Sequence, residues 1–587
     1  MMTLPSLAVI ERLELPETEY QFLSYFAGIV SQYPHNRMLL FAWIFCAYVL
    51  GVSSTELGDL MGCTDRNIRY VVAEVGGSQV GEGKTGRPGT GTSPEQRETC
   101  QPSMTLGLTR YAGLWLLLLW ILDSNLLPYC HWLSCTGVVG TPVQLVLTLL
   151  AVAACSLERI WAMNDVSDRG LALFTGRWTP LRASQLYTWL KQIEPGGVDL
   201  FYQGTKVEEW RLVNHYPAII SNDEHVVGHQ GGPKMPKGKV SKNGRKRPAH
   251  HLFMPFHLLA RRFVGLCVTL TKRKLCHIAG PQTQEMIQAR QLASADDTPL
   301  FQILDRGSYS QQAHTPLMQM HTEGQLDYLA QIKRTAKNVA QWERGLQWGE
   351  YTLHPYVRGS EWHWTPEQRH RLCLAQTTTS ISGVPQPVPT LLIIDLDKVD
   401  APDPKTKYAA AFATTLDDPL WTQADLYAWR QDHELAFRDS IHALGIDAKP
   451  KGYHKEQPAL PLDDPDQTTS LITHPIMFHS WIRALTYNRV RDLLDHLPDP
   501  ASGWTVLTAV RKLIRRTGLL QIQDDCLWVI FDPFPGDKIL TPYCDWVNAA
   551  DFTIPWLNHL KLRLSIADQP IGASLPNAQV RKLLFSP

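Results

Sequence analysis

The stretch Tyr427-Ala-Trp-Arg430-Gln-Asp-His-Glu434 decides the fold assignment, because it sets chemically distinctive side chains at helical spacing. Tyr427, Arg430 and Glu434 stand at i, i+3 and i+7, so at about 100° per residue they share one helix face. Arg438 stays on that face one turn further along. Such a face suits a metal-facing acid beside cations that bind phosphate. The alternative is a solvent-exposed face with i,i+4 Glu–Arg pairing.

Two earlier acids stand at the ends of predicted strands. Asp223 closely follows the apolar run at 218–221, and Asp305 directly follows the run at 300–304. A strand end can hold a carboxylate rigidly toward a cleft, and Glu434 on a neighbouring helix would complete the group. Three adjacent carboxylates either raise their pKa values or bind a divalent cation such as Mg²⁺. Taken singly, each acid is more simply explained as an ordinary surface residue, because solvated loop acids and helix-surface acids are common.

Three stretches together resemble one protein family. The helix stretch fits the Y-x-x-R-x-x-x-E signature of bacterial insertion-sequence transposases with an RNase H-like DDE core. Asp223-Glu-His225 resembles the first-aspartate region of that family. Leu304-Asp305-Arg306-Gly307-Ser-Tyr309-Ser310 resembles its second-aspartate region. The resemblance spans roughly residues 210 to 567.

The resemblance implies an α/β RNase H-like catalytic core, a mixed sheet flanked by helices, with a β-rich insertion. Asp223, Asp305 and Glu434 become the catalytic, metal-binding triad, holding two Mg²⁺ ions for which Mn²⁺ can substitute. Tyr427 and Arg430 become helix companions near the DNA end. Two metals about 4 Å apart would activate a water or a 3′-hydroxyl and stabilise the leaving oxygen of a phosphodiester.

The sequence departs from the family signature at one position. The signature has a Lys seven residues after the Glu, where this chain has Ile441. Arg438 or His442 could replace that cation. The long interval between Asp305 and Glu434 implies the inserted domain.

Two segments predict DNA contacts. The chain carries 56 Lys+Arg against 56 Asp+Glu, yet the segment 234–274 has no acid at all. Its first part is expected to form a flexible loop that binds the DNA backbone independently of sequence. The DNA-contacting candidates there are Lys234, Lys237, Lys239, Lys242, Arg245, Lys246 and Arg247.

The second segment predicts a helix-turn-helix. Ser53–Gly62 and Thr64–Val75 form two helices around a Gly62–Cys63 turn, and the second helix would offer its first residues to base edges. The outward side chains there are Arg66, Asn67 and Arg69. A plain helical hairpin is the alternative.

Composition and hydrophobic periodicity along the chain predict seven regions. Thr422 is expected to open the signature helix, with Asp425 completing a capping box. The regions are a helical helix-turn-helix region (1–75), a Gly/Pro-rich linker (76–103), an apolar helical bundle (104–205), the first part of the core (206–333), a β-rich insertion (334–405), the core helix with the catalytic Glu (406–450) and a C-terminal helical and β-rich region (451–587).

Four tryptophans crowd into the expected insertion: Trp342, Trp348, Trp362 and Trp364. They are expected either to form the core of a small β domain or to stack on a base flipped out of the cleaved DNA end.

The sequence therefore predicts a transposase that cuts and joins DNA with Mg²⁺. Its partners would be double-stranded DNA, namely the inverted repeats of an element and the target, and a second copy of the chain. It would act in the bacterial cytoplasm, associated with the nucleoid, without a membrane. The first alternative is a catalytically inactive, domesticated DNA-binding or regulatory protein. A second is a membrane-associated protein built around residues 111–157, although those apolar runs fall short of the roughly 20 residues a span needs.

Overall fold

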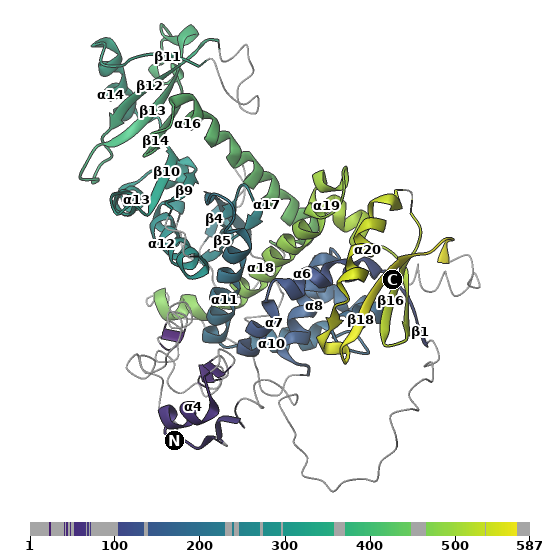
Figure 1. The fold of residues 1–587 in the computed structure, drawn as a ribbon. Helices are drawn as coiled ribbons and strands as arrows, with labels where there is room; N and C mark the ends of the chain where they lie inside the picture. Colours follow the sequence, from purple (N-terminus) through teal and green to yellow (C-terminus); the bar gives the residue numbers. More distant parts are fainter. Residues whose placement is uncertain are drawn as a thin grey trace, which may run out of the picture. The chain divides into compact units, whose positions relative to one another are not determined.

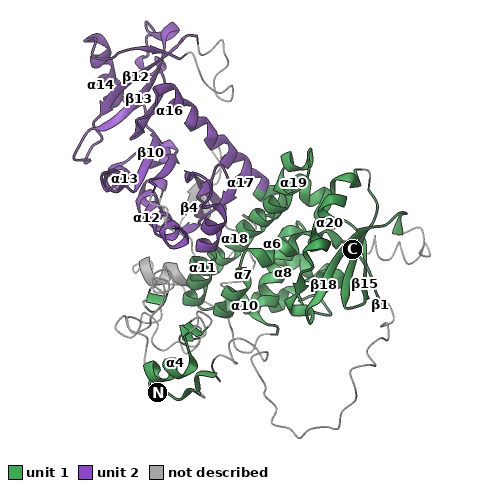
Figure 2. Cartoon of the chain, in the orientation of Figure 1, with its two compact units in different colours: residues 1–205, 440–453, 474–587 green, residues 206–439, 454–473 purple. Residues whose placement is uncertain are grey.

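The structure is a computed structural model. It describes residues 52–65 and short runs between 23 and 71, then 104–133, 139–228, 237–239, 246–269, 274–294, 298–356, 370–447, 465–534 and 536–571. Of residues 237–239, 246–248 and 465–473 only the backbone is described. The chain divides into two compact units (Figure 2). Unit 1 comprises residues 1–205, 440–453 and 474–587, and unit 2 comprises residues 206–439 and 454–473.

The described part of unit 2 is built on a nine-stranded mixed sheet (Figure 1). Its order is β11-β12-β13-β14-β10-β9-β2-β6-β7. The strands are β2 (Ile219–Asn222), β6 (Phe256–His257), β7 (Arg262–Phe263), β9 (Leu300–Leu304), β10 (Leu326–Gln331), β11 (His354–Pro355), β12 (Leu372–Thr379), β13 (Val388–Asp395) and β14 (Tyr408–Thr414). Strands β2, β9 and β10 are parallel neighbours, and β14 runs antiparallel to β10.

Helices flank this sheet. They are α12 (Leu275–Ala293), α13 (Gln311–Thr322), α14 (Ala336–Gln347), α16 (Leu420–Leu426) and α17 (Arg430–Leu444). The sheet and helices share a core that includes Leu304, Tyr328 and Tyr408. A smaller sheet joins β3 (Glu224–Gly228), β4 (Lys237–Lys239), β5 (Lys246–Phe253) and β8 (Cys267–Thr269).

Region 334–405 differs from the separate β-rich insertion that the sequence predicts. It opens with α14, because Thr335 caps the backbone N–H of Asn338 and the apolar face of the helix buries Val339 and Trp342. Its strands β12 and β13 continue through β14 into the same sheet as β10. The region therefore widens the core sheet.

Among the described residues of unit 1, a five-stranded sheet has the order β1-β15-β16-β18-β17. Its strands are β1 (Met104–Thr109), β15 (Gly518–Gln523), β16 (Cys526–Phe531), β17 (Thr553–Ile554) and β18 (Leu560–Ile566). Region 104–205 is thus not wholly helical, because β1 pairs antiparallel with β15. That pairing joins residues about 400 positions apart, which local sequence cannot indicate.

The helical part of unit 1 is apolar and buried. Its helices include α6 (Leu118–Asp123), α7 (Leu126–Tyr129), α8 (Pro142–Ala154), α9 (Arg169–Phe174), α10 (Ala183–Gln192), α11 (Pro195–Val213), α18 (Pro465–Asp495), α19 (Val506–Ala509) and α20 (Thr541–Ala550). Within the described residues, no single helix has both the length and the apolar character to cross a membrane. Segments Ala112–Asp123 and Leu126–Leu133 meet that length and composition only as a pair bent by 79°.

The N-terminal part contains α4 (Ser54–Met61), capped by the Ser53 hydroxyl. The helix ends at Gly62, whose φ of 63° lies in the left-handed region that favours glycine. Thr64 then accepts a hydrogen bond from the backbone N–H of Asn67, within a second helical stretch. Leu57 and Ile68 are buried between them.

Candidate active site

The sheet topology brings the two strand-end aspartates to one edge. Asp223 follows β2 and Asp305 follows β9, and these strands are parallel, with Asn222 in register with Leu304. The carboxyl ends of parallel strands share one edge, which is where open α/β sheets bind ligands. Asp223 and Asp305 are therefore held side by side without help from a flexible loop.

Helix α17, with the short 3-10 turn at Tyr427–Trp429 before it, brings the signature side chains to the same edge. The Arg430 guanidinium donates to Asp223 Oδ2 at 2.7 Å and also to Glu434 Oε1. The Tyr427 hydroxyl lies 3.3 Å from Asp305 Oδ1. The structure thus brings Asp223, Asp305, Glu434, Tyr427 and Arg430 together in one cluster.

Burial and charge perturb the acid–base behaviour of this cluster. Burial raises the pKa of Asp223 from 3.8 to about 6. Arg430 and the backbone N–H of Glu224 lower that pKa, while the negative charges of Asp305 and Glu434 raise it further. Burial alone would lower the pKa of Arg430, but the surrounding Tyr427 and carboxylates raise it above its ordinary value. Arg430 therefore stays charged.

A buried histidine anchors the signature helix to the sheet. His433 Nδ1 lies 3.0 Å from the Ser221 hydroxyl on β2, two residues before Asp223. The His433 ring also stacks on Phe256, with 5.3 Å between ring centroids and 3° between ring planes. Burial, helped by the Arg430 charge, lowers the pKa of His433 to about 3, so the ring is neutral. This contact could not be predicted from sequence, because one histidine inside a helix carries no distinctive pattern.

Glu224 and His225, which follow Asp223 directly, make contacts that hold this part of the site in place. Glu224 accepts a hydrogen bond from the Leu275 backbone N–H at the start of α12, and its carboxylate lies 2.6 Å from His251 Nδ1. His225 packs against Phe437 of α17, with 4.8 Å between ring centroids. These contacts fix the start of β3, directly after Asp223.

Arg438, the further member of the signature face, is exposed on α17. Within the described residues it forms no ion pair with the three carboxylates. Ile441 and His442 lie beyond it, in unit 1.

The predicted DNA-binding residues fall partly inside the described chain. Lys234, Lys242, Arg245 and Arg66 lie outside the described residues. Lys237 and Lys239 lie on β4, while Lys246 and Arg247 lie on β5, and the two strands pair antiparallel. The expected flexible loop therefore includes a β-hairpin, because β5 extends into the basic segment. Asn67 and Arg69 are exposed, and the Arg69 guanidinium pairs with Asp65.

Of the two roles expected for the tryptophans, base stacking is wrong for Trp342. This side chain is fully buried, and its indole N–H donates to the Thr379 hydroxyl at 3.0 Å. Trp348, which follows the last residue of α14, is 70% exposed. Trp362 and Trp364 lie outside the described residues.

The donor chemistry of the cluster fits Mg²⁺. Carboxylate oxygens are the ligands that Mg²⁺ prefers, and a dication would relieve the repulsion that Asp305 and Glu434 exert on Asp223. In this structure, the guanidinium of Arg430 supplies the positive charge that compensates the carboxylates. Among the described residues, no group of three metal-ligating side chains is arranged to hold a metal ion. Metal binding would therefore compete with Arg430 for Asp223 and Glu434.

No protein-family model and no curated protein matches the chain. Seven chains of solved structures are similar to it. One is the piggyBac transposase in a synaptic complex with hairpin DNA, which is 11% identical at a TM-score of 0.34. That alignment covers 70% of this chain and 81% of the neighbour. A similarity this low does not establish a common fold.

Proposed function

We propose that the chain is a DDE transposase, a metal-dependent DNA endonuclease and strand transferase of a mobile element, whose RNase H-like core lies in unit 2. One observation carries the proposal. Two aspartates at neighbouring parallel strand ends and the glutamate of one helix meet around Arg430 and Tyr427. Double-stranded DNA, as element ends and target, is the proposed substrate, and a homodimer is the proposed assembly.

The residues of the cluster have distinct proposed roles. Asp223, Asp305 and Glu434 would hold Mg²⁺ or Mn²⁺, which when bound supplies an activated nucleophile and stabilises the leaving oxygen. Arg430, held beside them, is placed to bind a phosphate oxygen of the DNA. Tyr427 orients Asp305 through its hydroxyl. His433 keeps α17 at a fixed distance from β2.

A catalytically inactive, DNA-binding descendant is the second candidate. The pairing of Arg430 with both Asp223 and Glu434 favours it, since that arrangement satisfies the carboxylates without metal. Ile441 stands in place of the expected Lys, and this departure also favours the inactive descendant.

The test is cleavage of the DNA that flanks the gene by purified protein in Mg²⁺ or Mn²⁺. We expect Asp223→Asn, Asp305→Asn and Glu434→Gln each to reduce cleavage more than about a hundredfold, because each removes a metal ligand. Asp432→Asn is the matched control, since Asp432 lies on α17 but outside the cluster. DNA binding should survive in all four variants.

Either of two results would change the assignment. If a triad variant cleaves at the wild-type rate, the residue that it replaces is not a metal ligand. Wild-type protein that binds flanking DNA but never cuts it is the inactive descendant.

A further inference from the structure

Two cations follow the end of the third parallel strand, β10, whereas an aspartate follows the end of each of the other two, β2 and β9. Strand β10 is parallel to β9, with Ala330 in register with Leu304, so its carboxyl end lies at the same sheet edge as Asp305. Lys333 and Arg334 follow that end within three residues of Gln331. This edge therefore changes from acidic to basic between β9 and β10.

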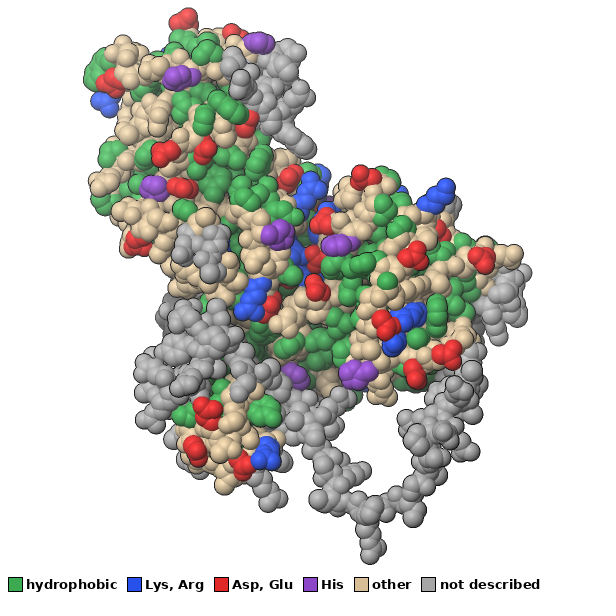
Figure 3. All heavy atoms as spheres, viewed as in Figure 1, with side chains coloured by type: hydrophobic (Ala, Val, Ile, Leu, Met, Phe, Trp, Pro, Cys, Tyr) green, Lys and Arg blue, Asp and Glu red, His purple; other side chains and the backbone are tan. Residues whose placement is uncertain are grey.

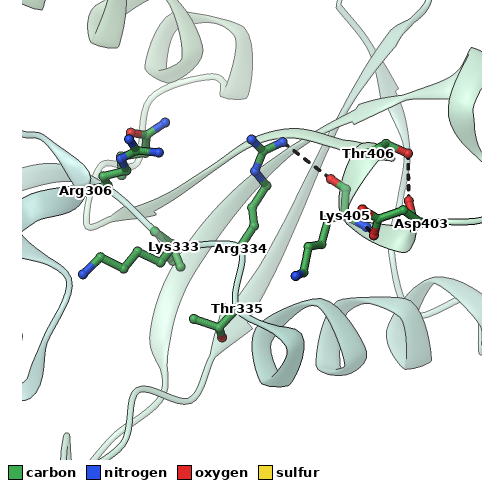
Figure 4. Close-up of a pocket in the computed structure, with 9 residues that line it drawn as sticks. Arg306, Lys333, Arg334, Thr335, Asp403, Lys405 and Thr406 are labelled. Atoms are coloured by element: carbon green, nitrogen blue, oxygen red, sulfur yellow. Dashed lines mark hydrogen bonds between the residues drawn. The ribbon is translucent and has the colours of Figure 1, made fainter. Parts of the chain in front are cut away.

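A pocket of about 480 Å³ opens beside these cations (Figure 4). Its size is within the ~300–1,000 Å³ typical of ligand pockets. The charged residues that line it are Arg306, Lys333, Arg334, Lys405 and Asp403. Four cations face one carboxylate, so the pocket has an excess of three positive charges.

Those cations are available to a ligand. None of the four forms an ion pair within the part of the chain that the structure describes, and all four side chains are exposed. The Arg334 guanidinium lies 3.5 Å from the Lys405 carbonyl (Figure 4). It also donates to the Tyr408 carbonyl at 2.6 Å, so its position is fixed. The single carboxylate, Asp403, accepts from the Lys405 backbone N–H at 3.0 Å. The Asp403 carboxylate is thus hydrogen-bonded within its own turn.

The start of α14 adds to the positive potential. Thr335, which caps this helix of 12 residues, also lines the pocket. Helix N-termini carry partial positive charge and favour anions. The cations and the helix end together give the pocket a positive potential that favours anions.

Two residues that line the pocket connect it to the carboxylate cluster. Gln331 lines the pocket, and its Oε1 lies 3.3 Å from the Tyr427 hydroxyl, which also contacts Asp305. Arg306 lines the pocket and is the next residue after Asp305. A strand held at the carboxylates would therefore continue into the pocket.

We propose that this pocket binds the phosphodiester backbone of the DNA strand held at the carboxylates, an inference that rests on the proposed function. Lys333 and Lys405 supply two exposed cations, and Arg334 supplies a third that backbone carbonyls hold in place. The contacts are to phosphate, so they contribute affinity and register without reading sequence.

The test measures binding of a short fluorescein-labelled duplex of mixed sequence over a KCl series. The double variant Lys333→Gln/Lys405→Gln removes two charges whose ammonium groups have no hydrogen-bond partner among the described residues. If each contacts one phosphate, the slope of log Kd against log salt should fall by about 1.8. The control Arg261→Gln/Arg344→Gln removes two exposed charges that do not line the pocket, and should leave the slope unchanged.

The outcomes separate this inference from the proposed function. A wild-type protein that binds no DNA overturns both. Wild-type binding with an unchanged slope in the pocket variant overturns the pocket alone. Calorimetry with inorganic phosphate at fixed ionic strength tests the remaining alternative, that the pocket binds free phosphate. If the pocket variant no longer binds phosphate but keeps the wild-type DNA slope, the pocket is a site for free phosphate, and the inference is overturned as well.

Discussion

Arg430 is the residue on which the candidate site depends. Three carboxylates at one sheet edge repel one another, and the rise in the pKa of Asp223 records that repulsion together with burial. A guanidinium suits this position better than an ammonium, because its planar fork can serve two carboxylates at once. The signature spacing of Tyr427, Arg430 and Glu434 made these three residues predictable from sequence. Gln331, which contacts Tyr427, and Ser221, which contacts His433, lie on distant strands, so only the fold shows these contacts.

Stability in acid should depend on His314, which is buried in unit 2 with Nδ1 3.3 Å from the Tyr328 hydroxyl. Burial lowers the pKa of His314 from 6.5 to about 4. The unfolded chain then binds a proton below pH 6.5 that the folded chain does not, so stability is lost as pH falls from 6.5 toward 4. By pH 5 the loss should be about 2 kcal/mol.

Urea unfolding of wild type and His314→Gln at pH 7 and pH 5 measures this effect. We expect the variant to lose about 2 kcal/mol less than wild type between the two pH values, since glutamine does not titrate. His354→Gln, at an exposed position on β11, should behave as wild type. Equal losses in wild type and His314→Gln would mean that the folded protein accommodates the charged ring.

At the scale of elements, local patterns predicted some boundaries and not others. The apolar run at 300–304 became β9 with the predicted bounds. The capping box expected at Thr422 is wrong, because α16 begins at Leu420 without a side-chain cap. Asp425 instead accepts a hydrogen bond from the Tyr356 hydroxyl at 2.6 Å. A partner 69 residues away cannot be identified from local sequence.

Helix α14 carries two tryptophans with opposite expected roles. Trp342→Ala should destabilise unit 2 by about 3–5 kcal/mol, because it empties a core position. Trp348→Ala should change stability by less than about 0.5 kcal/mol, because its ring is exposed. Thermal unfolding of the two variants checks this difference.

The exposed tryptophan has a second expected role, in stacking on a flipped base. With 2-aminopurine beside the cut site, wild type should show a fluorescence change on binding that Trp348→Ala loses, at a cost of about 1–3 kcal/mol in stacking. An unchanged signal would exclude Trp348 and direct the same test to Trp362 and Trp364.

At the scale of the whole molecule, charge balance limits how the protein can attract DNA. Lys+Arg and Asp+Glu are equal in number, and on the face in Figure 3 acidic and basic side chains are interspersed. Attraction to a polyanion must therefore come from local surfaces. The sequence indicated one of these, the basic segment at 234–247. The pocket beside β10 was not predictable, because Arg306, Lys333 and Lys405 are brought together only by the sheet.

The last prediction concerns the share of DNA affinity that the basic segment contributes. Replacing Lys237, Lys239, Arg245, Lys246 and Arg247 with glutamine should weaken binding to all DNA sequences alike. For every phosphate that these residues neutralise, the slope of log Kd against log salt should fall by about 0.9 in the variant. The size of the change therefore counts the residues of the segment that touch the backbone.

A second five-residue variant, in unit 1, controls for the change in net charge. It replaces Arg182, Lys191, Arg511, Lys512 and Lys538, which are exposed and lie outside the predicted DNA-binding segments. If net charge alone governed binding, both variants would show the same fall in affinity and in slope. If the basic segment contacts phosphate, only its own variant shows a reduced slope, because counterion release requires direct contact with the backbone. An unchanged slope in the segment variant would remove these five residues from the DNA interface and leave backbone binding to the pocket and Arg430.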